Sequence, residues 1–199
     1  MARQAERSAG TRAAIIAAAA DLFGRGGFAE TTMNQVAEAA GVAKGAIYHH
    51  FATKEALFEV VLEQVSAELA AALGRGAFQQ PDALAAISFG MSGYFAACAE
   101  GPIGQIVLRD GPAVLGWARW REIDEAHFGA LAPAALGAAM ESGLIRTQPV
   151  EPLARLILGA ATEAASACHA AADPAATAAD YAAALTALLE GLRIAPRPA

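Results

Sequence analysis

The chain has 199 residues, of which 56% are apolar, 17% are charged and 56 are alanine. An apolar content this high excludes a disordered chain. Alanine is the best helix former, whereas the β-branched residues typical of strands, valine and isoleucine, number only 18. Two cysteines, Cys98 and Cys168, exclude a disulfide scaffold and a four-thiolate zinc site. The composition therefore predicts an all-α protein.

Charge is distributed unevenly along the chain. Residues 1–54 carry a net charge of +2, and residues 55–199 carry −8. An acidic protein can still bind DNA through a small basic head, because the field near the contact face decides binding. The net charge alone does not distinguish a basic DNA-binding head from a chance excess of basic residues, so the sequence motifs must be considered.

Two apolar stretches bear on localisation. The stretch before Asp21 is too short for a signal peptide. The longest uncharged run, Ala83–Ala99, has 17 residues, the lower limit of a membrane span, and contains serines and glycines. We interpret it as a buried helix, and we expect a cytoplasmic protein with no membrane partner.

The N-terminal quarter shows a run of helix start and stop signals. Apolar residues from Thr11 to Arg25 recur at helical spacing, and two glycines follow. Thr32 and Gln35 match a capping box, which predicts a short helix to about Ala40. Beyond Gly41, we expect a second short helix over 44–50, and then a long helix capped by Thr53 that frays at Gly74 and Gly76.

Two short helices joined at a glycine and packed on a longer one describe a helix-turn-helix, whose second helix enters the major groove of DNA. In that helix, Ile47 faces the core, as does Phe51 just after it, while Lys44, Gly45, Tyr48 and His49 face outward. Glycine costs about 1 kcal/mol against alanine inside a helix, and close approach of the backbone to DNA is one use of that cost. The alternative is a generic helical hairpin with a polar face.

The residues themselves favour the DNA interpretation. The pairs and runs Gly27-Phe28, Thr31-Thr32, Val36-Ala37, Ala40-Gly41-Val42, Lys44-Gly45, Ile47-Tyr48, His50-Phe51 and Lys54-Glu55-Ala56-Leu57 resemble the N-terminal domain of the tetracycline-repressor (TetR) family over roughly residues 11–58. The resemblance implies a homodimeric, ligand-responsive regulator of nine or ten helices: a three-helix helix-turn-helix domain, then a helical ligand-binding and dimerisation domain.

We accordingly expect a DNA-binding domain at 1–54, a helical domain at 55–193 and a disordered tail at 194–199. The expected double-stranded operator is palindromic. Ala43 departs from the family, which usually has Ser or Thr there, and the missing cap weakens the helix by about 0.5–2 kcal/mol. The expected DNA contacts are Thr32, Gln35, Ala43, Lys44, Gly45, Tyr48, His49, His50 and Lys54.

The second half predicts further helices. Pro81 suits the first position of a helix that runs to about Glu100, and Asp173-Pro174 marks another start. Between Gly101 and Gly116, four glycines and two prolines predict a short helix between two breaks. The remaining predicted helices span 113–128, 131–142, 152–172 and 174–193.

Apolar helices with a few small polar groups are typical of ligand sites, although each such residue is more often plain core. The candidates for contact with a small hydrophobic or amphipathic effector are Phe89, Met91, Ser92, Phe95, Cys98, Arg109, Trp117, Trp120, His127 and Glu163.

The last two predicted helices carry small residues that permit close approach and more leucines than one face of a small monomer buries. They predict a four-helix dimer interface, the alternative being an internal core. The expected interface residues are Leu156, Gly159, Ala160, Ala164, Ala167, Leu185, Leu188 and Leu189.

Nothing in the sequence favours an enzyme. Lys44 lacks the spacing of a phosphate-binding loop, there is no metal-ligand cluster or nucleophile elbow, and Cys168 and His169 are neighbours on a helix and do not share a face. We expect no cofactor and no metal. Two alternatives to an effector-released repressor stay open: a constitutive DNA-binding protein with a filled core and, more remotely, a helical enzyme without a recognisable motif.

Overall fold

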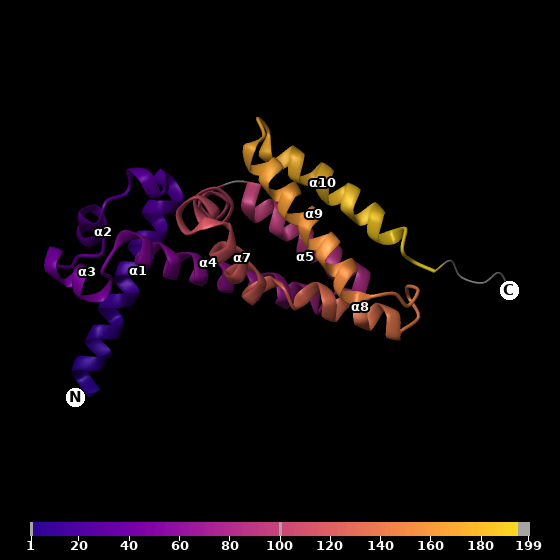
Figure 1. The fold of residues 1–199 in the computed structure, drawn as a ribbon, viewed down its shortest axis with the longest axis horizontal. Coiled ribbons are helices and arrows are strands. Elements are labelled where there is room, and N and C mark those ends of the chain that lie inside the picture. Colours follow the sequence, from indigo (N-terminus) through magenta and orange to yellow (C-terminus); the bar gives the residue numbers. More distant parts are fainter. Residues whose placement is uncertain (1, 100, 195–199) are drawn as a thin grey trace. The chain divides into compact units, whose positions relative to one another are not determined.

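Helices make up nearly all the regular structure in the computed structural model, which describes residues 2–99 and 101–194 (Figure 1). In that part of the chain, the only β-type pairing is an isolated antiparallel bridge between Ile145 and Arg193. The predicted all-α class is confirmed. The chain forms two compact units: one joins the residues up to Ser66 with Gly101–Arg121, and the other joins Ala67 onward with Glu122 onward.

The first unit begins with α1 (Ala2–Glu30), which is interrupted where Gly27 adopts a φ of 77°. The helices α2 (Met33–Ala39), α3 (Lys44–His50) and α4 (Lys54–Ala77) follow, with the predicted boundaries within a few residues. Thr53 caps α4 through its hydroxyl, which accepts from the Ala56 amide at 3.1 Å. The helix α4 does not end at Gly74 but continues to Ala77.

Three aromatic rings form the centre of this unit. Phe23 from α1 and Phe58 from α4 are buried, and the ring of Phe28, which follows the break in α1 at Gly27, contacts both. The ring centroids of each pair are 5.3 to 5.7 Å apart, a separation at which aromatic pairs add about 0.5–1.5 kcal/mol beyond area burial. This cluster fixes how α1 packs on α4, and these two helices support α2 and α3.

The segment after residue 100 differs from the prediction of a short isolated helix. It contains α6 (Pro102–Gly104), a π-helical segment η1 (Gln105–Asp110) and α7 (Gly111–Phe128), which follow one another directly. The second expected break is a kink inside α7, at Gly116 with a φ of 76°. Pro102 packs so closely on Gly24 of α1 that a Cβ there would collide with it.

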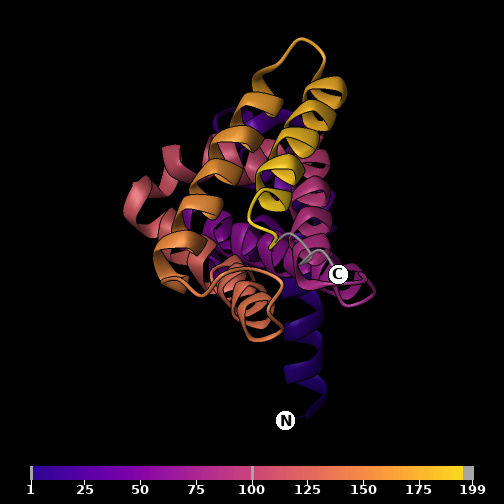
Figure 2. The same cartoon turned by 90° about the vertical axis from the view of Figure 1, so that its right-hand side faces the viewer.

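The second unit contains α5 (Ala83–Ala99), α8 (Leu131–Glu141), α9 (Val150–Ala170) and α10 (Pro174–Glu190), together with the ends of α4 and α7. Figure 2 shows α9 and α10 side by side, and both also pack on α5. The Asp173 carboxylate caps α10 as predicted. Pro81 is not the first residue of α5, because Asp82 caps that helix by accepting from the Ala85 amide at 2.9 Å.

No single helix in the described ranges is long and apolar enough to cross a membrane; only α5 taken together with Pro102–Phe128, across a bend, reaches the required length and composition. The prediction of a buried helix holds for one side of α5: Leu84, Ile87, Phe95 and Cys98 are buried, whereas most of its other residues are half-buried and Phe89 and Ala96 are exposed. Of the expected disordered tail, Ile194 is ordered through a hydrogen bond from its amide to the Leu144 carbonyl, and residues 195–199 lie outside the described residues.

Candidate DNA-binding surface and ligand cavity

The helices α2 and α3 form a helix-turn-helix with one well-capped and one uncapped start. At α2 the capping box is complete: the Thr32 hydroxyl accepts from the Gln35 amide, and the Gln35 side-chain oxygen accepts from the Thr32 amide at 2.8 Å. Both side chains, expected at DNA, are exposed and also hold the helix start. At α3 the Ala43 position makes no side-chain cap, as its methyl group predicts.

The two faces of α3 are distinct. Ile47 is fully buried and Phe51, which ends the helix, is 4% exposed, so they anchor α3 to the unit. Lys44, Gly45, Tyr48 and His49 are all exposed on the opposite side, and His50 is half-buried. The predicted outward face is therefore outward in the structure.

Gly45 has no structural reason to be glycine. Apart from its chain neighbours and the backbone of α3 itself, no described atom lies within 4 Å of the position where its Cβ would be, and its φ is not in the left-handed region. Gly41, by contrast, needs its freedom for a φ of 66° in the turn between α2 and α3. The helix penalty at Gly45 is thus unexplained by the fold and consistent with an external backbone contact.

Lys54, expected at a phosphate, is half-buried and its ammonium is bonded within the protein. Its ammonium donates to the carbonyls of Phe28 at 2.8 Å and Thr31 at 2.9 Å, and lies 4.0 Å from the Phe28 ring centroid. These contacts offset the unfavourable position of a cation in the first turn of α4. Sequence spacing could not reveal this role, because the two carbonyls belong to residues more than 20 positions earlier in the chain.

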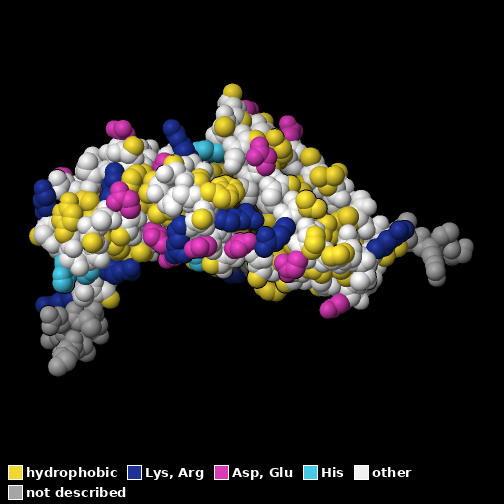
Figure 3. All heavy atoms as spheres, viewed as in Figure 1, with side chains coloured by type: hydrophobic (Ala, Val, Ile, Leu, Met, Phe, Trp, Pro, Cys, Tyr) yellow, Lys and Arg dark blue, Asp and Glu magenta, His cyan; other side chains and the backbone are white. Residues whose placement is uncertain are grey.

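Basic and imidazole side chains gather on the part of the first unit that carries α2 and α3 (Figure 3). The exposed Arg7 and Arg12 of α1 belong to this unit, and the Arg12 guanidinium lies 5.2 Å from the Phe51 ring centroid at the end of α3. Cations near an exposed helix face are the electrostatic requirement for holding phosphate groups.

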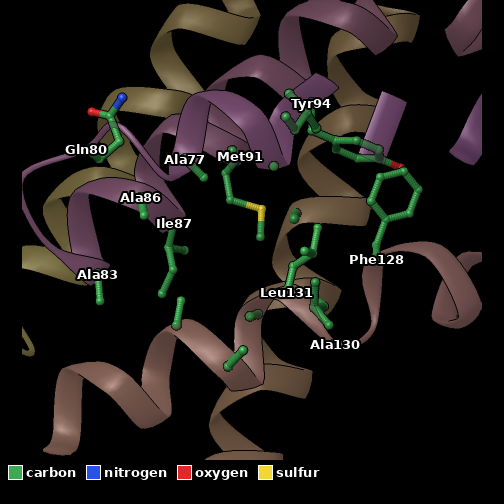
Figure 4. A pocket seen from close by; sticks show the side chains of 18 of the residues that line it. Ala77, Gln80, Ala83, Ala86, Ile87, Met91, Tyr94, Phe128, Ala130 and Leu131 are labelled. Carbon is green, nitrogen blue, oxygen red and sulfur yellow. The ribbon is translucent and has the colours of Figure 1, made fainter. Parts of the chain in front are cut away.

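The second unit contains an apolar cavity of about 640 Å³ (Figure 4). Its walls come from the end of α4, from α5, α8 and α9, and from the end of α7. Many lining residues are alanines, whose short side chains leave the space unfilled. The larger lining side chains are Leu73, Phe78, Ile87, Met91, Tyr94, Phe128, Leu131 and Leu158.

Of the ten residues predicted to contact an effector, only Met91 lines this cavity. Phe95 and Cys98 are core, Phe89 is 41% exposed and covers Gly76, and the Ser92 hydroxyl bonds back to Ser88. The half-buried His127 and the exposed Glu163 are absent from the lining. Apart from Met91, the structure does not place these residues at this cavity. The helix α5 is apolar on most sides, so periodicity could not identify the face that meets the cavity.

The remaining three candidates belong to the first unit. Trp120 is 2% exposed, and its indole N–H donates to the Val107 carbonyl of η1 at 2.8 Å. The Trp120 ring packs so closely on Gly111 that a Cβ at residue 111 would collide with it. Trp117 is 63% exposed and stacks against Trp120. Arg109 is exposed. The two tryptophans therefore lie in the first unit, outside the lining of this cavity.

The two thiols are not placed for chemistry. Burial raises the pKa of the Cys98 thiol to about 12, and it also raises the pKa of Cys168, so both stay protonated at neutral pH. The ring of His169 bonds the Cys98 carbonyl rather than either sulfur atom. Among the described residues, no three His, Cys, Asp or Glu side chains are grouped as a metal site.

The expected interface residues divide by exposure. On α9 and α10, Leu156 is 73% and Leu188 is 68% exposed, and Gly159 and Ala160 are exposed beside them. Ala164, Leu185 and Leu189 are instead buried within the unit, and Ala167 is half-buried. Half of the predicted set is thus available to a second copy, and three of its members are core.

Comparison with known proteins agrees with this architecture. A family model for bacterial regulatory proteins of the tetR family matches residues 15–61, and one for the tetracyclin repressor-like C-terminal domain matches residues 84–192. A TetR-family transcriptional regulator from Pectobacterium atrosepticum has a crystal structure that is 32% identical, covers 96% of this chain and 98% of its own, and superposes with a TM-score of 0.85.

Two curated regulators match over the N-terminal part alone. The regulator TtgR of Pseudomonas putida is 44% identical over 63 residues, 32% of this chain and 30% of that protein. The regulator RutR of Escherichia coli is 46% identical over 52 residues, 26% of this chain and 24% of that protein. The chain thus matches less than a third of the length of either.

The fold and the exposed α3 define a transcriptional regulator with a helix-turn-helix DNA-binding domain. With family models that match both its N-terminal and its C-terminal part, the chain belongs to the TetR family.

Proposed function

We propose that this protein is an effector-responsive repressor that binds a palindromic operator as a homodimer. The observation that carries the proposal is an exposed recognition helix in one unit and an apolar cavity in the other, within a single chain. A dimer with a two-fold axis presents two α3 helices to symmetric half-sites. We also propose that the protein acts in the cytoplasm, where the operator DNA lies.

Two helices offer a physical route between the units. The helix α4 starts at Lys54, beside the DNA-binding helices, and its other end contributes Leu73 and Ala77 to the cavity. The helix α7 likewise starts in the first unit and ends at Phe128 in the cavity wall. An effector that binds better to one arrangement of these helices shifts the population of DNA-binding states.

Dimerisation is proposed through α9 and α10. Exposed leucines on an otherwise alanine-rich surface, at Leu156 and Leu188, are costly to leave in water. The small residues around them let two pairs of helices approach closely. Permanent interfaces of this kind bury upward of about 2,000 Å² in total.

The cavity argues against the alternative of a constitutive DNA-binding protein with a filled core. A filled core would leave no space of about 640 Å³ inside the second unit, and pockets that hold small ligands have volumes of about 300–1,000 Å³. In the described part of the chain, no group of three His, Cys, Asp or Glu side chains supports the enzyme alternative with a metal site.

Selection of bound sequences from random duplex DNA tests the proposal. We expect an inverted repeat whose half-sites are related by the two-fold axis. Binding to it should weaken with salt by about 0.9 log units per log unit of salt for each phosphate neutralised. A selection that yields no inverted repeat, or binding that ignores salt, contradicts the proposal.

A further inference from the structure

The opening of the cavity is marked by the lining residues that reach solvent. Most of the described lining residues are buried or half-buried. The exposed ones come from two places in the second unit: one is Phe78, directly after α4, and the others lie at the start and along one side of α8, at Ala130, Leu131, Ala134 and Ala138. The cavity therefore opens to solvent between the end of α4 and the exposed side of α8.

Phe78 is the most exposed large apolar side chain in the described ranges. It is 94% exposed, against 45% for Leu131 on the other side of the opening. Single exposed apolar residues are common on proteins and need no explanation. Phe78 differs from these because its side chain borders an apolar cavity. Its ring therefore has an apolar surface within reach, which it does not use in the free protein.

The backbone at Phe78 is held in place, whereas the ring can turn. The Phe78 amide donates to the Gly74 carbonyl at 3.3 Å, and the next amide, of Gln79, donates to the Gly76 carbonyl at 3.2 Å. A ring that packs on almost nothing changes direction by rotation about its side-chain bonds alone, within picoseconds to nanoseconds. Reorientation of Phe78 therefore requires no change in the helices.

The end of the cavity beside Phe78 is lined by short apolar side chains. Phe78 lies in the chain between Ala77 and Gln80, which Figure 4 shows at the same end of the cavity as Ala83 and Ala86. The Gln80 side-chain amide is bonded to the backbone of α4 at 3.2 Å. The alanine side chains leave room for a ligand at this end, and an apolar ligand that fills the room presents a surface on which the ring can lie.

We propose that the effector enters between the end of α4 and α8, and that the Phe78 ring then turns from solvent onto the bound effector and covers it. The inference rests on the proposed function and adds the entrance and a ligand-contacting residue. The driving force is the removal of apolar surface of both the ring and the ligand from water. In the free protein the same rotation gains little, because an unfilled space offers no atoms to contact. The end of the effector that meets Phe78 is therefore apolar.

A neutral fluorescent probe, N-phenyl-1-naphthylamine, tests the inference. None of the described lining residues is Lys, Arg or His, and an uncharged apolar molecule needs no counterion. The full-length protein is labelled with 4-fluorophenylalanine at its eight Phe positions, and the signal of Phe78 is the one that Phe78→Leu lacks. Fluorine NMR in H2O and in D2O then measures the exposure of each ring. We expect Phe78 to show the largest solvent isotope shift in the free protein, and to lose at least half of it when the probe saturates the cavity.

Substitution at Phe78 measures what the contact contributes to binding. Phe78→Ala should weaken binding of the probe about five- to tenfold, mainly by faster dissociation, because the bound state alone loses the apolar contact. Phe78→Leu keeps part of the apolar surface and should weaken binding about twofold. The matched control is Gln79→Ala, on the next residue, which is exposed and outside the lining. It should leave the affinity unchanged. All three variants should keep the thermal unfolding midpoint of the free protein, because both side chains are exposed.

Ala86→Phe assigns the probe to the cavity. The added ring occupies the alanine-lined end, so this variant should abolish both the binding of the probe and the change in the Phe78 signal. Binding that survives Ala86→Phe would place the probe elsewhere and overturn the inference.

The remaining outcomes separate this inference from the proposed function. A Phe78 signal that keeps its solvent isotope shift beside the bound probe, an unchanged affinity of Phe78→Ala, or a probe that does not bind overturns the inference. A Phe78 ring that is shielded before the probe is added also overturns it, and shows instead that a second copy of the chain covers the ring. The proposed function is tested by release of the operator: it stands if any compound of a diverse panel releases the operator, whatever happens at Phe78, and it falls if none does.

Discussion

The Asp110 carboxylate accepts a hydrogen bond from the Phe28 amide at 2.7 Å, although the two residues are 82 positions apart. The Phe28 carbonyl accepts a hydrogen bond from the Lys54 ammonium at 2.8 Å. Phe28 follows directly after Gly27, whose positive φ interrupts α1. The chain at this break is thus held from η1 on one side and from α4 on the other, and the position of α2 depends on both.

Removal of Asp110 should loosen this break. We expect Asp110→Ala to lower the free energy of unfolding by about 1–3 kcal/mol, because a part-buried amide loses its partner. Asp110→Asn should cost less, since an amide oxygen still accepts. Urea denaturation measures both, with Arg109→Ala on the exposed neighbour as control. Equal stability of Asp110→Ala and Arg109→Ala would show that the bond contributes nothing.

Lys44 and Lys54 should respond differently to substitution. Lys54→Met leaves the Phe28 and Thr31 carbonyls without their donor, so we expect it to lower stability by about 1–3 kcal/mol. Lys44→Ala removes an exposed cation and should leave stability unchanged within about 0.5 kcal/mol. Its effect should appear in DNA binding, as relaxed preference at one base pair by about 1–3 kcal/mol. Thermal unfolding and operator titration, done in parallel, separate the structural role of Lys54 from the DNA-binding role of Lys44. A loss of stability in the Lys44 variant would contradict this assignment.

Gly45→Ala should trade stability against DNA binding. The added methyl group meets no atom from outside α3 and its adjoining residues, so α3 should gain up to about 1 kcal/mol of helix stability. If the α3 backbone approaches DNA closely at this point, the same methyl group lowers operator affinity. The measurements are unfolding of the free protein and titration of the selected operator. A variant that is more stable and binds with unchanged affinity would exclude close approach at Gly45.

Ala43→Ser supplies the cap that α3 lacks. The Ala43 backbone already has the extended conformation of a capping residue, with a φ of −63° and a ψ of 142°. A hydroxyl there should stabilise α3 by about 0.5–2 kcal/mol and tighten operator binding slightly. Ala43→Val serves as the control, because it adds bulk without an acceptor. If serine and valine behave alike in unfolding and binding, capping is not the missing interaction.

The proposed dimer interface is best tested at its exposed leucines. We expect Leu188→Glu or Leu156→Arg to give a folded monomer with strongly reduced operator affinity, by sedimentation and titration, although the helix-turn-helix is unchanged. Ala72→Arg on an exposed part of α4 is the control. Ala164→Arg is unsuitable, because Ala164 is 5% exposed and a cation there would disrupt the protomer itself. A stable dimer after both leucine changes would place the two-fold contact elsewhere.

The sequence by itself determined the helices and the DNA-binding motif. Their signals are local: Thr32 and Gln35 cap each other across one turn, Asp173 caps the helix that begins at the next residue, and Ile47 and Phe51 share a face by spacing alone. Such contacts depend on the helical repeat and on nothing farther along the chain. The outward face of α3 was predictable for the same reason.

Only the tertiary structure decided which side chains meet across long separations. The Lys54 ammonium donates to the Phe28 and Thr31 carbonyls, Asp110 accepts from the Phe28 amide at the break in α1, and Trp120 is buried with its indole N–H bonded to Val107. The cavity depends on where alanines of several helices face one another, and the positions of the 56 alanines along the chain carry no such information. Periodicity fixes a face, but the packing of several apolar helices decides which face meets a void and which meets a neighbour.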